Sequence, residues 1–150
     1  MNVGIYIYDQ AEVLDFAGPF EVFSTATRVS VSAEPFRVFL IAESTNAVSA
    51  RAGFRVLPDY GFNDHPHIDV LMIAGGVQTH EMNKPQVISW IAHQADTASV
   101  VASVCTGAFL LAKAQVIQSQ KVTTHWEDIA DLKSMFPALQ VIEGVRWVDQ

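Results

Sequence analysis

A chain of 150 residues is the length of one ordinary domain, and because half of its residues are apolar it can bury a core, which excludes a disordered protein. Its formal net charge of −7 repels nucleic-acid backbones and anionic lipid surfaces, so we expect neither as a partner. No apolar run reaches the roughly 18–20 residues of a membrane span, we find no signal-peptide pattern, and a single cysteine cannot form an intrachain disulfide. We therefore predict a cytoplasmic protein with a free thiol.

The first half of the chain contains the patterns of two buried strands, a helix and a small hairpin. Proline suits the first position of a helix, so the helix is predicted to begin at Gly18-Pro19. In chain order, the predicted elements are a strand at Val3–Tyr8, the helix, a strand at Phe36–Ala42, and a hairpin of Ala47–Ala50 with Phe54–Leu57 around Gly53.

The second half alternates strands with helices in the same way. Predicted strands are Val70–Ala74, Ser99–Val104, Leu139–Ile142 and Val145–Val148; predicted helices are Pro85–Ala95, a buried Ala108–Ala112, and one that follows a capping box at Thr124–Glu127. Such alternation predicts one α/β domain over residues 1–150, with a mainly parallel sheet covered by helices on both faces. Ligands of such folds bind at the carboxyl ends of the strands.

One cysteine lies at such a strand end. The strand at Ser99–Val104 runs into Cys105-Thr106-Gly107 and then directly into a helix, which predicts a sharp turn that presents the thiol above the sheet. A helix N-terminus favours the thiolate, so we expect a lowered pKa for Cys105. An isolated cysteine is more often a small buried hydrophobe, but this placement favours a functional thiol.

Four segments in order resemble the ThiJ/PfpI, or class I glutamine amidotransferase-like, superfamily. They are Val13-Leu-Asp-Phe-Ala-Gly-Pro-Phe-Glu-Val-Phe23, Asp69-Val-Leu-Met-Ile-Ala-Gly-Gly76, Ser103-Val-Cys-Thr-Gly-Ala-Phe-Leu-Leu-Ala112 and Val122-Thr-Thr-His-Trp126. The nearest branch contains isonitrile hydratase and the sensor domains of AraC-type regulators. The resemblance implies a flavodoxin-like three-layer sandwich with a nucleophile elbow at Cys105. Family domains usually continue with another strand and a helix, which we expect to be missing here, since the chain stops at Gln150.

The resemblance also implies an acid beside the nucleophile. The family places this acid on the loop after the first strand, which makes it Asp15 here, with Glu12 and Glu21 as weaker rivals. Next to a thiolate, a carboxyl group would be driven toward its protonated form and could then act as general acid or base. The alternative is that Asp15 serves only as an acidic residue that interacts with the dipole at the start of a helix.

Three further positions complete the implied site. Gly75 and Gly76 are expected to form an oxyanion hole with the amide of Thr106, although two glycines could equally mark an ordinary turn. By resemblance, the Thr106 hydroxyl is expected to bind substrate. His125 matches a histidine that approaches the cysteine in some family members, whereas the hydratase-like branch uses no histidine base, so its role is left open.

These features favour a cysteine-dependent enzyme, with isonitrile hydration as the leading chemistry and Cys105 and Asp15 as its catalytic residues. A metabolite- or oxidant-sensing regulatory domain is the alternative, followed by glyoxalase, deglycase, amidase or protease activity. We expect a small-molecule ligand, a homodimer by resemblance, and no cofactor or metal. His65-Pro-His67 lacks the spacing of metal ligands and is predicted to be a surface loop.

Overall fold

A four-stranded parallel sheet with the strand order β2–β1–β5–β6 lies at the centre of the computed structural model, which describes residues 1–31 and 35–150. Its strands are β1 (Asn2–Tyr6), β2 (Arg37–Ile41), β5 (Val70–Ile73) and β6 (Val100–Ser103). In register, Tyr6 of β1 pairs with both Ile41 and Ile73, and Ile73 pairs with Ser103. All four strands therefore end at the same edge of the sheet, where the loops that follow them meet.

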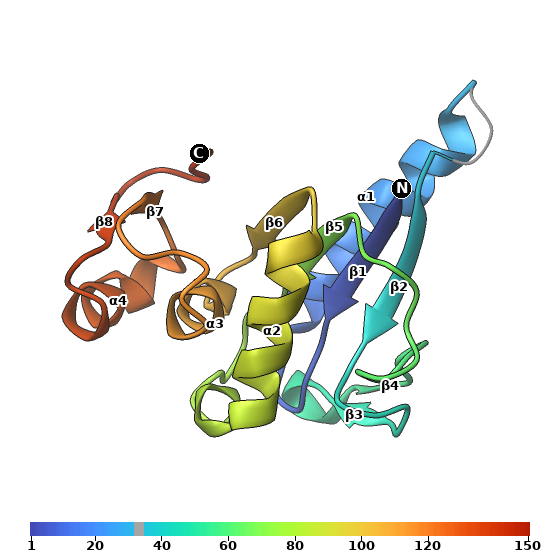
Figure 1. The fold of residues 1–150 in the computed structure, drawn as a ribbon, viewed down its shortest axis with the longest axis horizontal. Helices are drawn as coiled ribbons and strands as arrows, with labels where there is room; N and C mark the ends of the chain where they lie inside the picture. Colours follow the sequence, from blue (N-terminus) through green and yellow to red (C-terminus); the bar gives the residue numbers. More distant parts are fainter. Residues whose placement is uncertain (32–34) are drawn as a thin grey trace.

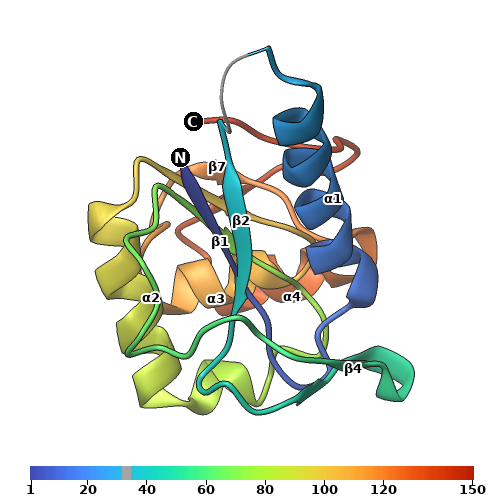
Figure 2. The ribbon, with the colours of Figure 1, turned by 90° about the vertical axis from the view of Figure 1, so that its right-hand side faces the viewer.

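Two long helices cover the sheet. α1 (Val13–Val29) and α2 (Pro85–Thr97) lie on opposite faces of it (Figures 1 and 2). The short α3 (Gly107–Lys113) packs against β5, β6 and α2. The core is apolar and almost sealed from solvent; among its members with no more than 2% exposure are Ile5, Ile41, Leu71, Ile73, Phe109 and Leu110. The predicted α/β fold with a parallel sheet is confirmed.

The remaining elements are short. They are β3 (Val48–Ser49), β4 (Arg55–Val56), β7 (Lys121–Val122), β8 (Gln140–Val141), α4 (Ile129–Met135) and the 3-10 helices η1 (Arg51–Gly53), η2 (Glu81–Asn83) and η3 (Trp126–Asp128). β3 and β4 pair antiparallel as the predicted hairpin, whereas β7 and β8 form a separate parallel pair beyond the β6 side of the main sheet (Figure 1). No helix in the described part of the chain is long and apolar enough to span a membrane.

Three predictions of local structure are wrong. α1 begins at Val13 rather than at Gly18, with Pro19 inside it, because the backbone N–H of Glu12 is held by the carbonyl of Gly75 at 2.8 Å and sets the helix start there. Residues 145–148 form no strand. The expected capping box is also absent from the structure, since α4 begins after Asp128 without a side-chain cap.

Candidate active site at the Cys105 elbow

Cys105 occupies the turn between β6 and α3 in a left-handed backbone conformation with φ of 54°. This conformation is uncommon for a residue with a side chain and marks a turn held in place by its surroundings. Two residues later, Gly107 packs so closely under β5 that a Cβ atom there would lie 2.3 Å from the carbonyl oxygen of Ile73. The chain thus turns as sharply as the sequence predicts, with the half-exposed thiol at the bend.

The carboxyl group of Asp15 is the partner of this thiol. Asp15 lies in the first turn of α1 and is 8% exposed, and its carboxyl group lies next to Cys105 and interacts with the thiol. Its Oδ2 also accepts a hydrogen bond from the backbone N–H of Gly75 at 3.2 Å. A Cβ atom at Gly75 would lie 2.7 Å from that same oxygen and 2.8 Å from the Cβ of Cys105, so only glycine lets the acid and the nucleophile meet here.

Burial decides the electrostatics of this pair. It raises the pKa of Asp15, against the opposing hydrogen bonds from Cys105 and Gly75. It likewise raises the pKa of Cys105 to about 11; the negative charge of Asp15 adds to the rise, and a hydrogen bond from the backbone N–H of Thr106 opposes it. At a pH between the pKa of Asp15 and that of Cys105, the carboxyl group and the thiol share one proton.

The expected lowering of the Cys105 pKa is therefore wrong. α3 has only seven residues, so the dipole at its N-terminus is weak, and it acts on a sulfur that is partly buried beside a carboxylate. Desolvation and like charge disfavour the thiolate more than the helix favours it. Forming the thiolate therefore requires a proton acceptor, and the carboxyl group of Asp15 is the titratable group beside the thiol.

The Thr106 side chain ties the elbow to the glycine loop. Thr106 is 5% exposed, and its Oγ1 lies 2.8 Å from both the backbone nitrogen and the carbonyl oxygen of Gly76. The Thr106 hydroxyl accepts a hydrogen bond from the N–H of Gly76 and donates one to the carbonyl oxygen of Gly76. The N–H groups of Gly75 and Gly76 are thus both engaged within the protein, and a ligand oxygen could use the expected oxyanion hole only by displacing these bonds.

His125 lies at the margin of the site. Its side chain is 38% exposed, and its Nε2 lies 3.4 Å from Oε2 of Glu127. It reaches Asp15 only through its electrostatic influence, and no hydrogen bond joins it to Cys105 among the described residues. The neighbouring Thr124 makes the contact instead, since its hydroxyl donates to the carbonyl oxygen of Cys105 at 2.9 Å.

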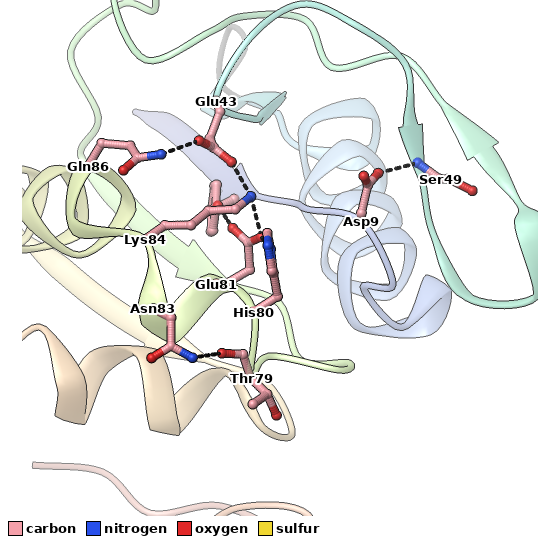
Figure 3. A network of polar contacts seen from close by, with 10 residues as sticks. Asp9, Glu43, Ser49, Thr79, His80, Glu81, Asn83, Lys84 and Gln86 are labelled. Atoms are coloured by element: carbon pink, nitrogen blue, oxygen red, sulfur yellow. Dashed lines mark hydrogen bonds and ion pairs between the residues drawn. The ribbon is translucent and has the colours of Figure 1, made fainter.

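The structure adds two buried polar residues that the sequence did not single out. Tyr8, two residues beyond the end of β1, is 3% exposed. Glu81 is 1% exposed; it accepts a hydrogen bond from the hydroxyl of Tyr6 at 2.5 Å and lies 2.6 Å from Nζ of Lys84, which also pairs with Glu43 (Figure 3). The rule that ligands bind at strand ends could have marked Tyr8, but no sequence pattern marks Glu81.

His65, from the His65-Pro-His67 segment, takes part in a hydrogen bond with another side chain. His65 Nε2 accepts a hydrogen bond from the indole of Trp90 at 3.1 Å. Within residues 1–31 and 35–150, no group of three or more His, Cys, Asp or Glu side chains could hold a metal ion.

Comparison with known proteins matches this chain to one family model and to two characterised proteins. A model of the DJ-1/PfpI family matches residues 1–150. Isonitrile hydratase from Pseudomonas putida is 31% identical over 127 residues, which are 84% of this chain and 53% of that protein. The HTH-type transcriptional regulator GbdR from Pseudomonas aeruginosa is 25% identical over 149 residues, which are 99% of this chain and 40% of that protein.

The fold has a close match among solved structures. A crystal structure of a ThiJ/PfpI family protein from Pseudomonas syringae superposes with a TM-score of 0.85 at 23% sequence identity, over 99% of this chain and 59% of that one. The chain thus spans about half the length of the relatives compared, 53% of the hydratase and 40% of the regulator.

Proposed function

The chain belongs to the DJ-1/PfpI family, and from this premise we propose that it is a cysteine-dependent enzyme that adds water to a small electrophile. The specific reaction proposed is the hydration of an isonitrile, R–NC, to the N-substituted formamide, R–NH–CHO. Its similarity to isonitrile hydratase supports this choice. The observation that carries the proposal is the position of the buried Asp15 carboxyl group beside Cys105, which lies at a turn with positive φ.

The raised pKa of Cys105, about 11, assigns Asp15 its role in the first step. The thiol is protonated at neutral pH, so the Asp15 carboxylate accepts its proton as the sulfur bonds to the isonitrile carbon. Asp15 then delivers that proton to the same carbon, whose lone pair receives it. The product of this step is a thioimidate, R–N=CH–S–Cys105, which contains every atom of the isonitrile and of the thiol.

The second step is hydrolysis of the thioimidate, which regenerates the free Cys105 thiol. The Asp15 carboxylate takes a proton from water as the oxygen of that water adds to the thioimidate carbon. The proton passes to the substrate nitrogen, the carbon–sulfur bond breaks, and the sulfur leaves with its electron pair and is reprotonated by the proton of the new hydroxyl group. The sum is R–NC plus water giving R–NH–CHO, with no oxidant or cofactor. The chemistry requires a reduced thiol, which suits the reducing compartment expected from the sequence.

The test is incubation with cyclohexyl isocyanide and measurement of N-cyclohexylformamide. We expect Cys105→Ala to abolish turnover and Asp15→Asn to reduce it by about 10²–10⁴-fold, the usual contribution of a general acid–base group. Glu21→Gln is the matched control, because Glu21 is an exposed carboxylate on the same helix, remote from Cys105 in the hydrogen-bond network, and it accepts a hydrogen bond from the hydroxyl of Thr25 at 2.9 Å. Formamide production that persists in Cys105→Ala would contradict the proposal, as would its absence with the wild-type protein.

A second function, ligand sensing without turnover, is supported by the match to a transcriptional regulator over 149 residues. In this case the isonitrile or a related electrophile would bind at the elbow and remain there. A rise in the thermal midpoint with cyclohexyl isocyanide, or an intact-mass increase at Cys105 without formamide, would favour sensing. Hydrogen peroxide provides a separate arm, since a sensing thiol would gain oxygen mass that Cys105→Ala does not.

The proposal includes a homodimer. Proteins of this family are often dimeric and bind small molecules. Along the exposed side of α1, a groove of about 690 Å³ has an almost wholly apolar lining, and Leu14, Val22 and Val29 are 74%, 65% and 65% exposed. Such a stripe is favourable to bury against a second copy of the chain. Sedimentation analysis should give a dimer for the wild type and a monomer for Val22→Glu; a monomeric wild type would contradict this part.

A further inference from the structure

The hydroxyl group of Tyr8 is buried without a hydrogen-bond partner among the described residues. The residue is 3% exposed and follows β1 at the edge of the sheet that carries the elbow. Tyr6, two positions earlier, provides a comparison: its ring lies 5.7 Å from that of Tyr8, and its hydroxyl donates to Glu81 at 2.5 Å. Among the described residues, the hydroxyl of Tyr6 thus has a hydrogen-bond partner and that of Tyr8 has none.

Packing does not explain this oxygen. A phenylalanine would fill the same space, and a hydroxyl removed from water without a new partner destabilises the fold. A buried polar group left unpaired therefore indicates a partner that the chain does not itself provide.

The surroundings of the hydroxyl are those of the nucleophile. Burial raises the pKa of Tyr8, and the charges of Glu81, Asp15 and Cys105 raise it further. The nearby Thr106 side chain opposes this rise, but its hydroxyl bonds to Gly76 and does not meet the geometry of a hydrogen bond with Tyr8. The hydroxyl therefore lies within electrostatic reach of Asp15 and Cys105 at the elbow, and of Glu81. Because its pKa is raised, it remains protonated and can donate a hydrogen bond at any working pH.

The other donors of the elbow are already engaged. The N–H of Gly75 donates to Asp15, that of Gly76 to Thr106, and that of Thr106 to the sulfur of Cys105. The Thr106 hydroxyl donates to the carbonyl oxygen of Gly76. Of the donors described here at the elbow, the Tyr8 hydroxyl is the one left for a substrate atom.

We propose that Tyr8 is a further catalytic residue, whose hydroxyl donates a hydrogen bond to the nitrogen or oxygen atom attached to the carbon that Cys105 attacks. The substrates it fits are small electrophiles in which that atom gains electron density on addition. The choice of an isonitrile as substrate rests on the proposed function. The role of Tyr8 as a hydrogen-bond donor does not.

Isonitriles show why a donor without a resting partner is useful. The nitrogen of R–NC has no free lone pair, because its electrons form the triple bond to carbon. When sulfur bonds to the carbon and the carbon takes a proton, one nitrogen–carbon π bond is lost and the nitrogen gains a lone pair. A hydrogen bond from Tyr8 to that nitrogen therefore forms during the reaction and is absent in the ground state, so it should raise kcat rather than lower KM.

Tyr8→Phe tests the proposal, with Tyr6→Phe as the matched control that removes the same single atom two residues away. With cyclohexyl isocyanide, we expect kcat to fall about 10–100-fold in Tyr8→Phe with KM within about twofold, and kcat of folded Tyr6→Phe to stay within about twofold of the wild type. The thermal midpoint should fall in Tyr6→Phe, which leaves Glu81 without its hydroxyl, and should not fall in Tyr8→Phe.

A second arm separates this proposal from the hydratase assignment. Acetaldehyde adds reversibly to a thiol: a carbon–sulfur bond forms, the carbonyl π bond breaks, and the proton goes to the oxygen. Protection of Cys105 from iodoacetamide by acetaldehyde measures this adduct, and we expect about tenfold weaker protection in Tyr8→Phe than in the wild type. Weaker protection with no isonitrile turnover would support the donor while rejecting the hydratase. Unchanged protection and unchanged kcat, or a lowered thermal midpoint in Tyr8→Phe, would overturn the role of Tyr8.

Discussion

Replacing Asp15 with asparagine separates the two effects that this carboxyl group has on Cys105. The substitution keeps the shape of the side chain and removes its charge. The charge of Asp15 helps to raise the pKa of Cys105 to about 11, against an ordinary value of 9.0. Asp15→Asn should therefore lower the thiol pKa and make the sulfur more reactive, although it removes the base needed for turnover.

The magnitude follows from the thiolate fraction. At about pH 8, a thiol with a pKa of about 11 is about 0.1% ionised, and each unit by which the pKa falls raises that fraction about tenfold. A thiolate of lower pKa is less nucleophilic, with a Brønsted slope of about 0.4–0.5, so the net gain is about threefold for each unit. Burial is the larger cause of the rise and remains in the variant, so we expect alkylation to become about three- to tenfold faster.

The assay is the rate of iodoacetamide modification of Cys105 by intact mass, from about pH 6.5 to pH 9.5. Glu21→Gln is the matched control, and the urea-unfolded proteins provide the reactivity of a free thiol. Slower alkylation in Asp15→Asn would refute the reasoning. It would show that protonated Asp15 stabilises the thiolate, and that the pair carries its charge on sulfur rather than on oxygen.

The remaining predictions concern stability. The pKa of Asp15 is raised in the folded protein, so protonation of this acid favours folding at low pH, and the contribution is lost as the pH rises through the folded pKa. The thermal midpoint of Asp15→Asn minus that of the wild type should therefore increase from about pH 4 to pH 8. A difference that stays constant with pH would contradict this prediction. Thr106→Val should cost about 1 kcal/mol in urea unfolding, because it leaves the part-buried N–H of Gly76 without its acceptor, whereas the carbonyl oxygen of Gly76 keeps the hydrogen bond from the N–H of Gln78. Thr25→Val, which removes an exposed hydrogen bond to Glu21, should cost less than about 0.5 kcal/mol; equal losses would contradict a stabilising role for the Thr106 hydroxyl. Lys84→Met should cost about 2–3 kcal/mol at neutral pH, since it leaves the buried carboxylate of Glu81 without its cation; unchanged stability would mean that the pair contributes nothing.

Much of the fold was predictable because its signals are local. The apolar runs of β1, β2, β5 and β6 and the helices between them are continuous in sequence, and they indicate a parallel sheet without any knowledge of contacts. The turn at Cys105 was predictable for the same reason. The start of α1 was not, because the bond from Glu12 to Gly75 that sets it joins residues far apart in the chain.

From the sequence alone we predicted the residues of the proposed site: a cysteine on a strand-to-helix turn, and Asp15 by resemblance to the family. The protonation and hydrogen bonding of these residues could be described only from the folded structure. Burial and the nearby carboxylate raise the thiol pKa that the helix N-terminus alone would have lowered. The glycine N–H groups are engaged, and the Tyr8 hydroxyl has no hydrogen-bond partner within the described part of the chain, because hydrogen bonds and desolvation depend on which atoms meet across the fold. Burial and distance are properties of the packed chain, and no local pattern of residue types specifies them.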